Sequence, residues 1–394
     1  MRNLMIARSI IAAAALSGAA ACVSVTQIES SGTRAQTRTQ PPATAQEALR
    51  GYYDRLATEV SLPQAHRGAV FDTSQTLTRL GFGSCNHHDR SQDMWPVAAA
   101  KNPQLFLAIG DNVYGDYGYR GGAALGSFRA AYEQQAGHAE FQAFRRQVPM
   151  MATWDDHDYG PNDSGGSFFA KEWSERIFET FWHSPERVKA RPGIYDSVMI
   201  GPDGKRVQLI MLDTRFFRSN LVEGEFVENL GGYDQNLDPQ ATMLGAEQWA
   251  WLQRELAKPA DLRILVSSIQ VLTDAHRWEA WSRMPLERER LYEALADRNG
   301  GGLVMLSGDR HQGAIYKHRP EALGEEVWEF TSSSMNLAFL RESGTDREPD
   351  PKRVTPMVAQ ENFGMVEIDW AVREVTFDLL DDSGATIEKR SSRF

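Results

Sequence analysis

Metal-binding residue types follow short apolar runs at several places along this sequence. They are Cys85, Asp111, Tyr114, Asp156, His157, Asp309 and His311. Sulfur, imidazole and carboxylate groups are soft, borderline and hard donors, and they favour different cations. Thiolate, phenolate and carboxylate around one cation suit Fe³⁺, whereas an all-oxygen site suits a hard cation such as Ca²⁺.

The carboxylates of Asp111, Asp156 and Asp309 could supply the all-oxygen site. Asp111 could also bridge the two cations, an arrangement that fits two-metal hydrolysis of a phosphate ester. In the mechanism we expect, the metals lower the pKa of a water so that hydroxide attacks phosphorus in line. His157 would then act as a general acid and protonate the leaving alkoxide.

The strand that precedes Asp111 is the element that positions this chemistry most clearly. Leu105 to Ile109 are five consecutive apolar residues, too few for a convincing helix, and they predict a strand buried on both faces. Gly110 then allows a sharp turn that delivers Asp111 and Tyr114 together. In open α/β sheets, functional groups lie beyond the carboxyl ends of the strands, so we expect a site there.

Five other apolar runs end in glycine or polar residues in the same way, at 78–82, 148–153, 207–212, 262–266 and 303–306. Helices are predicted at 92–100, 128–146 with a break near Gly137, 169–181, 245–257 and 287–297. After His311 the pattern changes to short alternating strands at 327–332, 363–369 and 372–380, the last two forming a hairpin near Trp370. We therefore expect a second sheet packed on the first, in an α/β fold of four αββα layers, with two mixed sheets flanked by helices.

The N-terminal residues predict export. Arg2 and Arg8 flank a short positive region, and the apolar stretch at 10–21 that follows it is too short to span a bilayer comfortably. Small residues directly before Cys22 indicate a lipoprotein signal over 1–22, with the lipid attached to Cys22. We thus expect a bacterial protein that is periplasmic or anchored to a membrane through this lipid.

The remaining chain divides once. Residues 23–46 are rich in Ser, Thr, Gln, Ala and Pro and predict a flexible linker, and 47–394 predict a single catalytic domain. A composition of 42% hydrophobic and 24% charged residues is typical of a globular protein. The net charge of −11 argues against a nucleic-acid partner, which needs clustered Lys and Arg. The expected partner is a small phosphate ester, and the sequence carries no signal for an oligomeric state.

Four short motifs carry a resemblance to a known family. They are Gly83-Ser84-Cys85, Gly110-Asp111-Asn112-Val113-Tyr114-Gly115-Asp116, Trp154-Asp155-Asp156-His157-Asp158 and Ser307-Gly308-Asp309-Arg310-His311. In this order they resemble the signature of the PhoD-like alkaline phosphatases, within the calcineurin-like metallophosphoesterase superfamily. The resemblance covers residues 78–380 and implies a four-layer αββα fold with an Fe³⁺ and Ca²⁺ centre that acts on phosphomonoesters or phosphodiesters.

The resemblance also implies individual roles. Cys85 and Tyr114 resemble iron ligands, His311 would complete the iron site, and Asp111 would bridge the metals. His157 would be the acid or a histidine just outside the ligands.

The second metal site departs from the usual pattern of related enzymes. Asp156 stands where they have Asn, and Asp309 where they have His, and both would face the harder metal. Divalent cations other than Ca²⁺ are therefore alternatives at this site. Larger family members carry an N-terminal β-sandwich domain and a twin-arginine signal, neither of which this sequence shows.

Several neighbouring residues admit two interpretations. Asp155 could be a ligand, or it could cap the loop and hold His157 in place. Arg215 could bind a phosphate oxygen through its fork, or form a structural ion pair with Asp213 or another carboxylate. Asp116 and Asp158 are expected outside the metal ligands or in solvent, and His87 and His88 in an exposed loop, with substrate contact as the alternative. Cys85 could also be an ordinary buried free cysteine.

A non-catalytic surface lipoprotein that binds metal or phosphate is the alternative class. His157 favours the enzyme, because a pure binding module needs no acid histidine beside its carboxylates. A serine nucleophile is disfavoured, since neither Ser84 nor Ser307 lies in a Gly-x-Ser-x-Gly turn.

Overall fold

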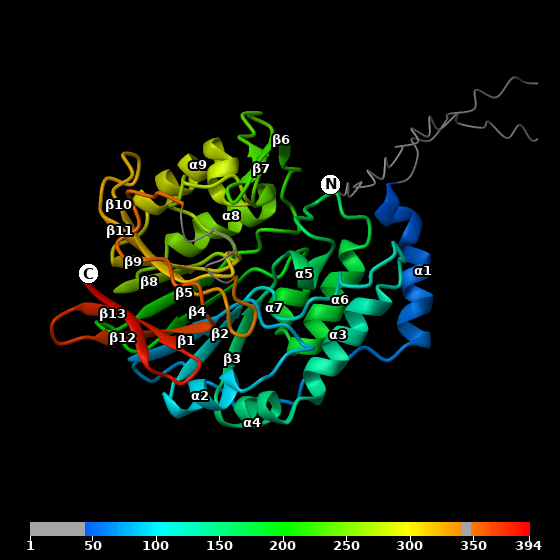
Figure 1. Cartoon of the computed structure of the whole chain (residues 1–394), viewed down its shortest axis with the longest axis horizontal. Helices are drawn as coiled ribbons and strands as arrows, with labels where there is room; N and C mark the ends of the chain where they lie inside the picture. The colour runs from blue at the N-terminus through cyan, green and yellow to red at the C-terminus, as the bar shows by residue number, and fades with distance from the viewer. Residues whose placement is uncertain (1–43, 340–347) are drawn as a thin grey trace, which may run out of the picture. The chain divides into compact units, whose positions relative to one another are not determined.

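Two six-stranded sheets pack against each other at the centre of the fold (Figure 1). The computed structural model describes residues 44–339 and 348–394. The first sheet contains β1 (Arg79–Gly83), β2 (Leu105–Ile109), β3 (Met150–Thr153), β12 (Asn362–Asp369), β13 (Glu374–Asp381) and β14 (Thr386–Arg393), in the order β14–β13–β12–β1–β2–β3. The second contains β4 (Asp196–Ile200), β5 (Val207–Met211), β8 (Leu262–Val266), β9 (Gly302–Ser307), β10 (Ala314–His318) and β11 (Val327–Thr331), in the order β10–β11–β9–β8–β5–β4. A separate hairpin is formed by β6 (Val222–Val227) and β7 (Gly231–Asp234).

Helices cover the outer faces of both sheets, which completes the four layers (Figure 1). The first sheet is covered by α2 (Met94–Ala100), α3 (Gly126–Gly137), α4 (Ala139–Gln147) and α6 (Lys171–Trp182). Helix α1 (Ala45–Glu59) packs on the outside of α6, where the rings of Tyr53 and Trp173 stack at 5.3 Å. The second sheet is covered by α8 (Gly245–Leu256) and α9 (Pro285–Ala296). The short helices are α5 (Asp156–Tyr159), α7 (Glu186–Lys189) and the 3₁₀ turn η1 (Trp281–Arg283). Among the residues described, no helix combines the length and apolar character that crossing a membrane requires.

Strand β2 shows why the two sheets must be covered on both sides. Every residue of β2 is buried, as the sequence predicts. Because side chains alternate along a strand, Leu105, Leu107 and Ile109 point between the sheets and contribute to the core there. Phe106 points the other way and packs on Trp95 of α2, with ring centroids 5.6 Å apart.

The expected fold class is confirmed, but one strand assignment is wrong. The hairpin of β12 and β13 forms as predicted, with Asp369 opposite Glu374, yet it joins the first sheet and not the second. Strand β12 pairs antiparallel with β1, placing Met365 opposite Gly81. The second sheet is instead built on β5, β8 and β9, which are parallel. Local periodicity cannot assign a strand to a sheet, because the pairing partner lies hundreds of residues away.

Element boundaries follow the sequence closely elsewhere. The predicted break in the helix near Gly137 separates α3 from α4 at His138. Helix α1 begins at Ala45, two residues before the expected start of the domain at Glu47, because Thr44 and Glu47 form a reciprocal capping box. The expected export signal and Cys22 lie outside the described residues.

Candidate metal centre

The carboxyl ends of strands from both sheets bring potential metal ligands together. Strands β1, β2 and β3 are mutually parallel, and so are β5, β8 and β9. Four groups have ligand atoms within 4.8 Å of one another: Cys85–Asp111–His311, Asp111–Asp156–His157, Asp111–Asp155–Asp156–Asp309 and Asp156–Asp163–Glu279. Asp111 belongs to three of the four groups, which is the position that a bridging carboxylate requires.

The backbone at these strand ends is strained. Cys85, Asp111, Asp309 and His311 all have positive φ angles, between 52° and 61°. Such conformations cost free energy in residues with a side chain, and they cluster at functional sites because they aim particular groups. Gly110, with φ of 117°, allows the turn before Asp111, where a Cβ would lie 2.7 Å from the Cβ of Asp155.

The Asp111 carboxylate is buried and only partly hydrogen-bonded. Its Oδ2 accepts a bond from the Tyr114 hydroxyl at 3.0 Å and lies 3.5 Å from the Cys85 Sγ. Its Oδ1 has no hydrogen-bond partner among the described residues. Burial, together with the charges of Asp155 and Asp156, holds the pKa of Asp111 well above its usual range, although His157 opposes this.

Cys85 and Tyr114 both face Asp111 and are fully buried. Burial, with the Asp111 charge as the second cause, raises the pKa of the Cys85 thiol and of the Tyr114 phenol well above their ordinary values. Without a cation both groups therefore keep their protons. A bound cation would displace those protons, as metal binding by thiolates and phenolates requires.

His311 is oriented for ligation by its outer nitrogen. Its Nδ1 lies 2.7 Å from the Leu337 carbonyl oxygen, which only accepts, so Nδ1 carries the proton. The lone pair is therefore on Nε2, and a carbonyl partner of this kind is typical of metal-binding histidines. Burial lowers the pKa of His311 to about 4, so the ring is neutral at pH 7.

Asp156 begins α5 directly after β3, and both of its carboxylate oxygens are hydrogen-bonded. Oδ1 accepts from the backbone N–H of His157 at 3.0 Å, and Oδ2 from that of Asp163 at 2.7 Å. Burial would raise the pKa of Asp156, but the charges of His157 and Arg215 outweigh it and leave the pKa below its usual range. Asp309 is more exposed to solvent than Asp156. Burial and repulsion by the Asp155 charge nevertheless raise the pKa of Asp309 well above its usual value.

His157 is held beside the carboxylates by Asp116. Its Nδ1 lies 2.8 Å from Asp116 Oδ1, and its ring centroid lies 4.3 Å from that of Tyr114. Burial alone would lower its pKa, but the charges of Asp156 and Asp111 and the bond to Asp116 raise the pKa of His157 to about 12. Asp116 thus contacts His157 and belongs to none of the four ligand groups, and its expected position outside the ligands stays a prediction.

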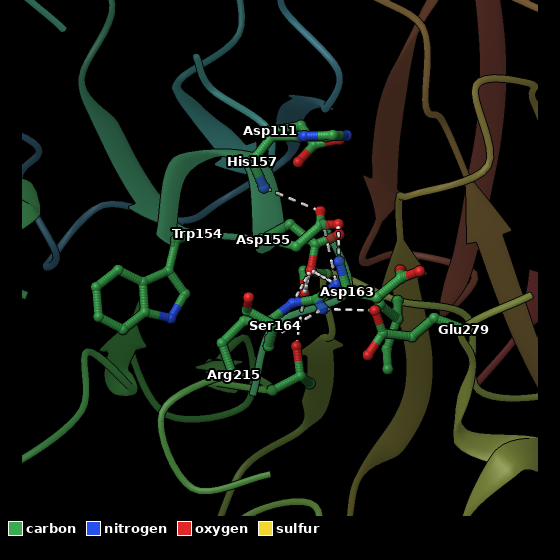
Figure 2. Close-up of polar contacts among 12 residues, drawn as sticks. Asp111, Trp154, Asp155, His157, Asp163, Ser164, Arg215 and Glu279 are labelled. Carbon is green, nitrogen blue, oxygen red and sulfur yellow. Dashed lines mark hydrogen bonds and ion pairs between the residues drawn. The ribbon is translucent and has the colours of Figure 1, made fainter. Parts of the chain in front are cut away.

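Arg215 forms buried ion pairs with carboxylates, the contact that one of its two interpretations predicts (Figure 2). Its Nε donates to Asp155 Oδ1 at 2.6 Å, and its Nη1 pairs at 2.5 Å with Glu279, a partner that no sequence pattern indicates. The guanidinium is completely buried, so it is already committed to these carboxylates. The hydrogen bond between Asp213 and Arg215 involves the Arg215 backbone N–H, which donates to Asp213 Oδ1 at 2.9 Å.

Asp155 and Asp158 stabilise the turn that presents Asp156. Asp155 is the N-cap of α5, and Asp158 Oδ1 accepts from the Asp155 backbone N–H at 2.6 Å, completing a capping box. Asp155 also accepts from Ser268 Oγ at 2.6 Å and has one oxygen without a described partner. Capping is thus observed, while ligation through the free oxygen of Asp155 stays open. Asp158 is buried and not in solvent.

The expectation that His87 and His88 are exposed is wrong. Each is only 7% exposed. The ring of His87 stacks between those of His88 and Tyr114, at centroid distances of 5.0 and 4.8 Å. This stack depends on the turn after β2, which places Tyr114 opposite His87, and no local pattern around the two histidines could show it.

A loop after β11 connects the two halves of the centre, and sequence reasoning missed it. Ser333 Oγ lies 3.1 Å from the Cys85 Sγ and accepts from the backbone N–H groups of Arg310 and His311 at 2.6 and 2.8 Å. Asn336 accepts from the His87 N–H at 2.6 Å. The run of three serines at 332–334 was the available signal, but serine runs are common in loops.

The donor set fits bound cations. Asp111 and Asp155 each have a buried oxygen with no described partner, which is costly unless a cation or water satisfies it. Arg215 and Arg218 pair with Asp155 and Glu279, which leaves the carboxylate charge of the other aspartates in excess. A positive ion at Asp111 would offset that excess and also accept the sulfur and imidazole donors beside it.

The protein is thus a four-layer αββα sandwich with a cluster of potential metal ligands at its strand ends. Comparison with known proteins gives the family. The model of the PhoD-like phosphatase family matches residues 80–379, and the chain belongs to this family.

Two individual relatives agree with this placement. The chain is 23% identical over 273 residues to alkaline phosphatase D of Bacillus subtilis (strain 168), covering 59% of this chain and 45% of that protein. The chain thus spans less than half the length of this curated relative. A solved structure described as the structure of PhoD superposes with a TM-score of 0.62 at 18% identity, over 84% of this chain and 70% of that one, and supports the shared fold.

Proposed function

We propose that this protein hydrolyses phosphate esters at a two-cation centre bridged by Asp111. The observation that carries the proposal is the convergence of ligand atoms around Asp111, with thiol and imidazole on one side and carboxylates on the other. Membership of the PhoD-like phosphatase family supports the reaction class. Monoesters and diesters are both candidate substrates.

We assign Fe³⁺ to the side of the centre with mixed donors. Cys85, Tyr114 and His311 would hold it together with Asp111, because thiolate and phenolate donors favour a trivalent or soft cation over Ca²⁺. Asp156 and Asp309 would hold Ca²⁺, or another divalent cation, on the other side of Asp111. When bound, such cations would supply Lewis-acid chemistry, lowering the pKa of water and offsetting the charge of the phosphoryl oxygens.

The residues of the chain would orient and protonate the substrate. Asp116 holds Nδ1 of His157, which leaves Nε2 as the atom that could donate a proton to the leaving oxygen. Burial lowers the pKa of His157, but in the metal-free protein the carboxylates around it outweigh burial and raise this pKa. Burial of the centre excludes most water and strengthens each of these interactions.

Hydrolysis of nitrophenyl monoester and diester substrates, with metals counted in the same preparation, tests the proposal. Asp111→Asn keeps the side-chain volume but removes the bridging charge, and it should lose bound metal and activity together. Asp382→Asn, at an exposed aspartate, is the matched control and should retain both. A fully metallated wild-type protein that binds phosphate but hydrolyses neither ester would support the non-catalytic binding protein instead.

We further propose that the protein is exported and tethered through a lipid on Cys22. The support is the apolar stretch at 10–21 that ends in small residues before this cysteine. One acyl chain binds a membrane only weakly, so the several chains of a lipoprotein would be needed. In fractionated cells the wild-type protein should be found with membranes, and Cys22→Ala in the soluble fraction. A wild-type protein that is already fully soluble would contradict the tether.

A further inference from the structure

Two exposed aromatic rings contact the candidate metal centre. Among the described residues, the exposed large aromatic side chains are Tyr117, Phe226 and Phe339. Tyr117 is 56% exposed and Phe339 is 42% exposed. Single exposed apolar side chains are common on protein surfaces, so exposure alone indicates nothing. Tyr117 and Phe339 differ from Phe226 because each contacts a histidine ring of the candidate centre.

Tyr117 lies on the side of the centre that carries the proposed acid. Its ring meets those of His87, Tyr114 and His157 edge-on, at centroid distances of 5.2, 5.4 and 5.7 Å. These three rings are almost completely buried, and Tyr117 is the exposed member of the cluster. A group that leaves toward His157 would therefore pass beside Tyr117.

Phe339 lies on the side of the proposed iron ligand His311. The two rings stack at 4.2 Å with an angle of 16°, and the Phe339 backbone N–H donates to the His311 carbonyl oxygen at 2.9 Å. Tyr114 links the two sides, since its ring lies 6.2 Å from that of His311. The two exposed rings thus adjoin the same buried group of side chains, Tyr117 through His157 and Phe339 through His311.

We propose that Tyr117 and Phe339 form a subsite for a planar aromatic ring in the alcohol part of the substrate, such as a nucleobase. This inference rests on the proposed function: a phosphoryl group held at Asp111 would place its ester alcohol beside these rings. Stacking on aromatic side chains recognises any base by its π face. A small polyol would instead call for hydrogen-bonding groups, which exposed phenyl and phenol rings supply poorly.

The test compares a nucleoside 5′-monophosphate with ribose 5-phosphate. Both release a primary alcohol of the same sugar, so the leaving groups match and only the base differs. Wild type should favour the nucleotide in kcat/KM by roughly 5- to 100-fold, the range expected from stacking of one base. If only diesters are turned over, the methyl diesters of the same two compounds replace them.

Tyr117→Ala and Phe339→Ala should each reduce this ratio toward one, mainly through KM for the nucleotide, while Tyr117→Phe should preserve it. Phe226→Ala is the matched control, because Phe226 is an exposed ring of β6 that packs on Trp278. This substitution should leave the ratio as in wild type. A ratio within one variant is independent of the fraction of active protein, so partial misfolding does not obscure the result.

Two failures are distinguishable. Hydrolysis of both compounds with a ratio that neither alanine substitution changes would overturn the aromatic subsite while leaving the proposed function intact. A fully metallated protein that hydrolyses none of the esters would overturn the proposed function itself.

Discussion

His157 is the residue on which the proposed acid catalysis depends. Its Nδ1 contacts Asp116. Its ring lies in the ligand group with Asp111 and Asp156, and not in the group that contains Cys85. His157→Ala should lower kcat by roughly two to four orders of magnitude, the usual contribution of general acid–base catalysis. Metal content should remain near that of wild type, as measured by elemental analysis.

Asp116→Asn provides a graded comparison for this prediction. It should reduce kcat less than His157→Ala, because the ring would remain but lose the carboxylate that orients it. Near-normal turnover by a fully metallated His157→Ala protein would contradict the assignment of the acid.

Tyr114 tests the identity of the metal directly. Its hydroxyl lies 3.0 Å from Asp111 Oδ2, and the ring is buried between His87 and His157. A phenolate bound to Fe³⁺ donates charge and absorbs visible light, whereas Zn²⁺, with its filled d shell, gives no such band. The purified protein should therefore be coloured, and Tyr114→Phe should lose or shift the band in its visible spectrum.

Cys85→Ser should also alter that band, since a thiolate is a second charge donor to Fe³⁺. Circular dichroism would show whether each variant keeps the wild-type fold. A colourless, iron-free wild type with full activity would exclude Fe³⁺ and leave a general two-metal phosphoesterase.

At the scale of elements, Arg215 connects the loop after β5 with the start of α5 and with the loop that precedes η1. Its completely buried guanidinium contacts Asp155 and Glu279. Arg215→Met should lower the free energy of unfolding by about 3–5 kcal/mol, because removing one partner of a buried ion pair leaves the other charge uncompensated. Urea unfolding would measure the change.

Lys189→Met is the control for this prediction. Lys189 pairs with Glu186 at 3.1 Å, and the two side chains are 38% and 91% exposed. An exposed pair contributes only about 0–1 kcal/mol, so this substitution should have a small effect. An Arg215→Met protein that is as stable as wild type but has a raised KM would instead favour phosphate binding by Arg215.

For the whole molecule, the excess of buried carboxylates makes the metal-free protein sensitive to alkaline pH. Burial raises the pKa of Asp155 and Asp158 to about 7 and that of Asp163 to about 8. At these three carboxyls the folded protein therefore binds more protons than the unfolded chain above pH 4, and their contribution to the free energy of unfolding falls as pH rises toward these values. Thermal unfolding of chelator-treated protein should show a lower Tm at about pH 9 than at about pH 7.

Buried histidines oppose this trend at lower pH. Burial lowers the pKa of His87 and His311 to about 4 and that of His276 well below its ordinary value, so their contribution to stability increases with pH. The stability gained from these histidines is complete by about pH 7, because histidines of the unfolded chain are mostly neutral there. The comparison of Tm values therefore starts at about pH 7. Bound cations should reduce the fall in Tm, and a metal-free protein equally stable at both pH values would contradict the prediction.

The sequence alone predicted the layered fold and most of the candidate site. Apolar runs of strand length that end in glycine or polar residues gave β2 and its neighbours, because burial on both faces leaves a strong local signal. The rule that functional groups follow the carboxyl ends of strands then selected Cys85, Asp111 and His311, whose ligand atoms the structure places within 4.8 Å.

Only the tertiary structure decided how the strands divide between the sheets and what surrounds each functional group. The pairing of β12 with β1, the burial of Arg215 against Glu279, and the contacts of Ser333 all join segments far apart in the chain. Such contacts depend on long-range packing, and residue type and spacing do not encode them locally. The stacked position of His87 was misjudged for the same reason, since its burial comes from Tyr114 on another strand end.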